Sequence, residues 1–113
     1  MVRKLKKYEN TVLSILNEYL ENRKNHPIFE YQLITDTLHK HYQVVRTGWD
    51  KTLFIHQIIL HFQIKEDEKI WLWVNKTEVE VDTVLMKNNV STLDIVIGFQ
   101  SKMMRELSGY ALA

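Results

Sequence analysis

The sequence predicts an α+β domain with one long N-terminal helix, a four-stranded antiparallel meander and two or three short C-terminal helices. The longest run of alternating apolar and polar residues lies within residues 53–75, and its break at residues 66–68 is typical of a hairpin turn. The first 24 residues instead carry apolar residues at three- and four-residue spacing, which indicates a helix. A chain of 113 residues is long enough for one hydrophobic core but not for two, so we predict a single domain over residues 1–113.

The first predicted helix covers about residues 2–24. It ends before His26 and Pro27 because the residue that precedes a proline is disfavoured in helical conformation. We expect this helix to lie across the sheet with one apolar stripe against it, formed by Leu5, Tyr8, Val12, Ile15, Leu16 and Tyr19.

Two strands follow, at about residues 28–37 and 42–49. Residues 48–52 supply turn residues before the third strand, and no stretch between the strands is long enough for a crossover helix. An antiparallel meander is therefore the simplest topology.

The last two strands are joined by Glu66, Asp67 and Glu68. A three-residue connection pairs Ile64 with Ile70, and continuing that register pairs Phe62 with Leu72 and Leu60 with Val74. Side chains of one parity share a face, so the predicted helix-packed face carries Phe54, Ile58, Leu60, Phe62, Ile64, Ile70, Leu72 and Val74.

The opposite face of the hairpin is unusual because it carries aromatic residues. The same register places Gln63 beside Trp71 and His61 beside Trp73, where a one-sided sheet would show polar groups to water. We predict that these four residues, together with Trp49, form a patch that binds another protein chain. The alternative is that the C-terminal helices or the apolar tail cover this face within one subunit.

The C-terminal region predicts short helices. Thr77 with Glu80, and Ser91 with Asp94, have capping-box spacing, which favours helix starts at both places. The first helix is expected to end near residue 88, and the second, over residues 93–97, to end at Gly98 as a left-handed cap. A third helical turn is expected near residues 103–107.

Few residues in this chain point to catalysis or to metal binding. There is no cysteine, and His39 with His41 are two imidazoles without a third ligand nearby. His56 and His61 differ in parity, so a regular strand would turn them to opposite faces. We expect no enzymatic activity, no metal and no cofactor.

The basic residues at the start of the chain offer an alternative function. Arg3, Lys4, Lys6 and Lys7 concentrate positive charge at one end, whereas the formal net charge of the whole chain is only +1. Direct DNA binding through these four residues is therefore the alternative to a protein-interaction role. No apolar run reaches the about 20 residues that span a bilayer, so we expect a cytoplasmic protein with no membrane partner.

A set of short motifs in order along the chain is similar to the XisI family. These are Tyr42-Gln43, Gly48-Trp49-Asp50, Leu60-His61, Ile64-Lys65, Lys69-Ile70-Trp71, Thr77-Glu78, residues 94–99 and the tail at residues 108–113. The likeness runs from the first helix to the last residue. Two stretches depart from the family pattern: Gln100-Ser101-Lys102 replaces a His-Pro-Pro run, and the hairpin turn lacks the family's frequent Asp-Gly.

The resemblance implies a controlling factor for excision of the fdxN DNA element in cyanobacteria, acting with a XisH-type partner beside a site-specific recombinase. It implies no catalytic residues. Arg105 matches the family pattern, and we add it to the predicted partner-binding residues. The partner chain is expected to be a XisH-like protein or a second copy of this chain.

Overall fold

The computed structural model describes residues 4–113 of the chain. Helix α1 (Lys4–Glu21) is followed by strands β1 (Phe29–Asp36), β2 (His41–Asp50), β3 (Leu53–Ile64) and β4 (Ile70–Asn75). Helix α2 (Val81–Lys87), the short 3₁₀ helix η1 (Thr92–Asp94), strand β5 (Ile95–Ile97) and helix α3 (Lys102–Ser108) complete the chain. The predicted α+β class is confirmed.

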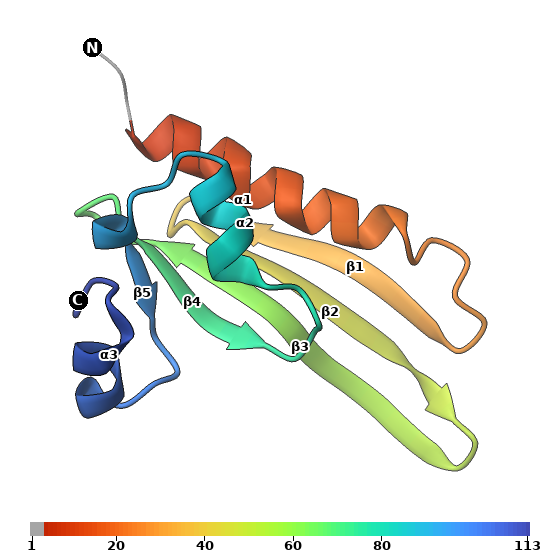
Figure 1. The fold of residues 1–113 in the computed structure, drawn as a ribbon. Helices are drawn as coiled ribbons and strands as arrows, with labels where there is room; N and C mark the ends of the chain where they lie inside the picture. The colour runs from red at the N-terminus through yellow and green to blue at the C-terminus, as the bar shows by residue number, and fades with distance from the viewer. Residues whose placement is uncertain (1–3) are drawn as a thin grey trace.

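The five strands form one sheet in the order β1-β2-β3-β4-β5. The first four make the predicted antiparallel meander, and α1 lies across them (Figure 1). The predicted stripe of α1 is buried at Tyr8, Val12, Ile15, Leu16 and Tyr19. These side chains pack with Tyr42, Leu60, Phe62, Ile70 and Leu72 of the sheet in one core.

Strand β5 was not expected, and it pairs with β4 in parallel. We predicted a helix over residues 93–97, but only Thr92–Asp94 are helical, and Ser91 caps them by accepting a hydrogen bond from the Leu93 amide. Ile95, Val96 and Ile97 are buried, as is typical of a parallel strand covered on both faces. A short run that is apolar throughout fits a strand and a buried helix equally well by its period.

The predicted cap of α2 is also wrong. Its N-cap residue is Glu80, which makes no side-chain capping bond. The Thr77 hydroxyl instead donates to Asn75 Oδ1 and accepts from the Val79 amide, within the turn that follows β4. Nor does Gly98 take a left-handed conformation; that role falls to Gly109, at the end of α3 with φ of 82°.

The hairpin between β3 and β4 has the predicted register near its turn. Ile64 pairs with Ile70, and Phe62 pairs with Leu72. Glu68 takes the left-handed position that this glycine-free turn requires, with φ of 64°. Beyond Phe62 the register shifts at a β-bulge, so that His61 lies opposite Val74 and not opposite Trp73 as predicted. Leu60 pairs with Asn75 and not with Val74, and Val74, predicted to face the helix, shares the face of His61.

A second bulge lies between β2 and β3. Val44 pairs with Leu60 and Val45 pairs with Ile58, which leaves Ile59 as the extra residue. One extra residue reverses the faces of all side chains before it in the strand. Ile59 is therefore buried beside Leu60, while Phe54 and Ile58, predicted to face the helix, are exposed on the opposite side.

Candidate protein-interaction face

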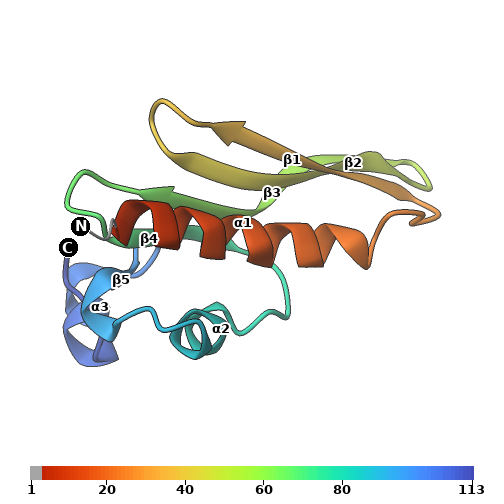
Figure 2. The ribbon, with the colours of Figure 1, turned by 90° about the horizontal axis from the view of Figure 1, so that it is seen from above.

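We call the side of the sheet that faces away from α1 the outer face. Directly paired residues of antiparallel strands share a face, so the registers assign its members. Trp49 pairs with Phe54, Gln43 with His61, and Gln63 with Trp71. In Figure 2, α1 and α2 lie on one side of β1 and β2, and among the described residues no helix covers the other side. The registers assign to the outer face His41, Gln43, Val45, Thr47, Trp49, Phe54, His56, Ile58, His61, Gln63, Trp71 and Val74, and Trp73 is the unpaired residue of the bulge beside them.

The structure brings five of the predicted partner-binding residues to this one face. Trp73 lies at the bulge, but its indole stays on the outer face, because Trp73 Nε1 donates a hydrogen bond of 3.0 Å to Gln63 Oε1. Its ring also stacks on that of Trp71, with ring centres 5.0 Å apart. The sixth predicted residue, Arg105, reaches this face from α3.

The C-terminal segment covers the Trp71 end of the outer face. Trp71 is only 7% exposed and packs against Val96 and Ala111. The Ala111 amide donates a hydrogen bond of 2.9 Å to the Ile95 carbonyl, which fixes the tail along β5. The alternative that the tail covers this face is thus realised at Trp71, while Trp73 is half-buried.

Two cations further cover Trp71. Lys65 Nζ lies 3.9 Å from the centre of the Trp71 ring, and the Arg105 guanidinium lies 5.6 Å from the same ring. Such contacts place positive charge against the electron-rich faces of an indole. Arg105 therefore lies against the covered end of the face.

Gly98 allows the backbone to pack closely on Trp73, because a Cβ at position 98 would lie 2.8 Å from a ring carbon of Trp73.

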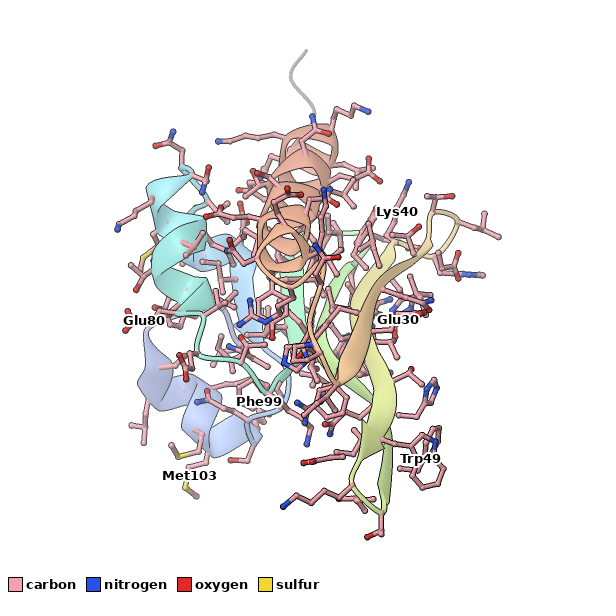
Figure 3. The ribbon with its side chains drawn as sticks, turned by 90° about the vertical axis from the view of Figure 1, so that its right-hand side faces the viewer. Glu30, Lys40, Trp49, Glu80, Phe99 and Met103 are labelled. Carbon is pink, nitrogen blue, oxygen red and sulfur yellow. The ribbon has the colours of Figure 1, made fainter. Side chains whose placement is uncertain are left out.

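The opposite end of the outer face is open. Trp49 is 62% exposed and Phe54 is 51% exposed, and their ring centres lie 5.1 Å apart. The His56 ring stacks on Phe54, and Ile58 adds an exposed aliphatic side chain to the same face. Figure 3 shows Trp49 directed away from the body of the molecule, on the side opposite α2 and α3. Clustered exposed aromatic residues are typical of protein-binding surfaces.

Two histidines form the centre of the outer face. His41 Nδ1 and His61 Nε2 are 2.9 Å apart. Burial, together with the nearby His41, lowers the pKa of His61 below its ordinary value. The bulge at Ile59 also brings His56 to this face, contrary to the prediction that His56 and His61 point to opposite sides.

The other histidine pair considered from the sequence is not formed. His39 lies in the turn before β2, where its Nδ1 is 2.8 Å from Asp36 Oδ2. Within residues 4–113, no three histidine or acidic side chains gather in a way that could hold a metal ion.

The basic residues of α1 mostly contact the protein itself. Lys4 Nζ lies 3.5 Å from Asp94, and Lys7 Nζ donates to the Asn89 carbonyl at 2.9 Å. Asp94 is buried and also accepts a hydrogen bond from the Tyr8 hydroxyl; burial and this bond raise the pKa of Tyr8 to about 12. Lys6 is exposed, and Arg3 lies outside the described residues.

Sequence reasoning missed a second exposed apolar surface. It lies on and beside α3, where none of the helix's residues is buried. Met103 is 71% exposed and Leu107 is 77% exposed, and Figure 3 shows Met103 at the margin of the molecule. Their three- and four-residue spacing in the sequence predicted only a helical turn, because spacing does not tell which side of a helix meets the core. Phe99, Met103, Met104 and Leu107 form this surface.

Comparison with known proteins identifies relatives over the whole fold. The model of the XisI protein family matches residues 2–112. The crystal structure of a XisI-like protein from Anabaena variabilis ATCC 29413 has a TM-score of 0.88 and 35% identity, over 96% of this chain and 99% of that one.

A second crystal structure, that of the fdxN element excision controlling factor XisI from the same organism, has a TM-score of 0.85. It is 28% identical, and the match covers 98% of this chain and 100% of that one. No curated protein matches the chain. Among the described residues, none of the helices has the length and apolarity needed to cross a membrane.

Proposed function

The chain belongs to the XisI family, as its motifs predicted, and we propose that it is a non-catalytic controlling factor in the excision of a DNA element. We propose further that it acts by binding another protein chain through the open end of its outer face. The likeness to the excision controlling factor of Anabaena variabilis, which extends over 98% of this chain, supports the first part. The exposed pair of Trp49 and Phe54 supports the second.

The open end of the outer face suits protein binding for a physical reason. A rigid aromatic side chain buries a large area while few torsions are fixed on binding, and here two such rings already pack against each other at 5.1 Å. The covered end contributes less, because Trp71 already has its partners within the chain. Trp49 is therefore the residue that we expect to contribute most to binding, followed by His61, Gln63 and Trp73 nearer the centre.

The proposed partner is a XisH-like protein, and calorimetric titration of that protein tests the proposal. We expect wild-type protein to bind, and Trp49→Ala to weaken binding by more than about tenfold, since hot-spot tryptophans contribute 2 kcal/mol or more. Leu107→Ala, which removes a similarly exposed residue from the surface on α3, is the matched control and should bind like the wild type. Absence of binding by the wild type, or equal losses for both variants, would remove the support for this function.

A further inference from the structure

A cleft of about 650 Å³ at the C-terminal end of α1 collects basic residues from three separate parts of the chain. Arg23 follows α1, Arg46 lies on β2 and Lys76 follows β4. His26, in the loop between α1 and β1, also lines the cleft, and Glu78 is its one acidic lining residue. With neutral histidine the lining carries three positive charges and one negative charge.

None of the three cations has a carboxylate partner in the part of the chain that the structure describes, where the ion pairs all involve other residues. Arg46 donates through Nε and Nη2 to Gln57 Oε1, which is an amide oxygen and leaves the charge unneutralised. Arg23 Nη1 donates to the Tyr19 carbonyl at 3.3 Å. Both arginines are half-buried, and charges that leave bulk water are usually paired.

Aromatic rings hold the two guanidinium groups in place. The Arg23 guanidinium lies 3.7 Å from the centre of the Tyr19 ring, and that of Arg46 lies 4.8 Å from the centre of the Phe29 ring. Tyr31 joins the two sides, because it pairs with Arg46 across the strands and its ring centre is 6.0 Å from the Arg23 guanidinium. The two guanidinium groups are thus held against rings of α1 and β1.

Two further polar groups of the cleft, on His26 and Tyr19, can donate hydrogen bonds. His26 Nδ1 accepts from the backbone amides of Ile28 and Phe29, at 3.1 and 3.0 Å. The proton of a neutral His26 imidazole must then lie on Nε2, which makes that atom a donor. Burial raises the pKa of Tyr19, so its hydroxyl also keeps its proton.

We propose that this cleft binds a ligand with adjacent phosphate groups. Guanidinium forks match phosphate oxygens, and an excess of two positive charges matches more than one phosphate better than it matches a single carboxylate. Adjacent phosphates occur in free nucleotides and along a nucleic-acid backbone. The inference does not depend on the proposed function, since it uses no residue of the outer face.

Two probes and two neighbouring variants test the proposal. Inorganic pyrophosphate is titrated by calorimetry, and a short fluorescein-labelled DNA duplex is titrated by anisotropy, both at low salt. Arg23→Gln should weaken binding by about tenfold or more, as expected for loss of charge-assisted hydrogen bonds. Lys24→Gln is the matched control, because it removes the same charge from the next residue, which is exposed and paired with Glu21. It should bind within about twofold of the wild type.

The exposed Lys76 provides a second variant, Lys76→Gln, that keeps the test valid if Arg23→Gln does not fold; it should also weaken binding. Binding of pyrophosphate without the duplex would support the proposal and assign the cleft to free nucleotides. Duplex binding that pyrophosphate competes away would support it and assign the cleft to a nucleic-acid backbone. The proposal is wrong if neither probe binds the wild type, or if Arg23→Gln and Lys24→Gln lose affinity equally, because charge alone would then explain binding.

Discussion

The two ends of the outer face should respond oppositely to loss of a tryptophan. Trp71 is 7% exposed and packs against Val96 and Ala111, so Trp71→Ala removes a buried ring and leaves a cavity under the C-terminal segment. Truncation of a buried tryptophan or phenylalanine to alanine costs about 3–5 kcal/mol of the free energy of unfolding. Trp49 is 62% exposed, and its truncation should cost less than about 1 kcal/mol, the loss of its contact with Phe54 included.

Urea unfolding followed by far-ultraviolet circular dichroism measures both values, and the slope of each transition shows whether the two-state treatment holds for both variants. We expect Trp71→Ala to shift the midpoint strongly and Trp49→Ala to leave it close to that of the wild type. A loss below about 1 kcal/mol for Trp71→Ala would show that the C-terminal segment does not hold this ring. A loss for Trp49→Ala as large as that for Trp71→Ala would place Trp49 in the core and refute the interface assignment.

Two further substitutions test the packing and the electrostatics of the same face. Gly98→Ala places a Cβ 2.8 Å from a ring carbon of Trp73, and we expect it to cost about 1–3 kcal/mol in urea unfolding; wild-type stability would contradict the close packing. Burial and the nearby His41 lower the pKa of His61 in the folded protein, so the unfolded chain binds a proton at this residue more readily than the folded one. Stability should therefore fall as the pH drops below the ordinary His61 pKa of 6.5. Melting temperatures measured over this range should fall less steeply for His61→Gln than for the wild type; equal slopes for the two proteins would refute this account.

The parts of the fold that depend on local chemistry could be predicted from the sequence. The apolar stripe of α1 and the pairing of Ile64 with Ile70 follow from residue spacing and from the length of one turn. The bulges at Ile59 and Trp73 could not be predicted, because each lies in a run of consecutive apolar residues and only the partner strand shows which residue is the extra one. These bulges decide which side chains are exposed, and the bulge at Ile59 explains the wrong faces predicted for Ile58 and His56.

The parts that depend on distant contacts could not be predicted. Residues 95–97 are all apolar, so their pattern does not distinguish a helix from a strand. They form a strand because the edge of β4 is available to pair with them. Likewise, the spacing of Trp71 and Trp73 predicted that they share a face. It did not show that Ala111 covers Trp71 while Trp49 stays exposed. The cationic cleft escaped notice for the same reason, since Arg23, Arg46 and Lys76 come from separate elements and share no motif.

Hydroxyl-radical footprinting of the protein alone and mixed with a XisH-like protein tests most directly whether the open end of the outer face binds another protein chain. This method reports side-chain exposure residue by residue, and the open end of the outer face can be compared with the exposed apolar surface on α3. We predict that the partner protects Trp49, Phe54 and Ile58, while Met103 and Leu107 on α3 stay as reactive as in the free protein. Protection of Met103 and Leu107 without Trp49, or a complex that leaves all five residues unchanged, would contradict the central claim.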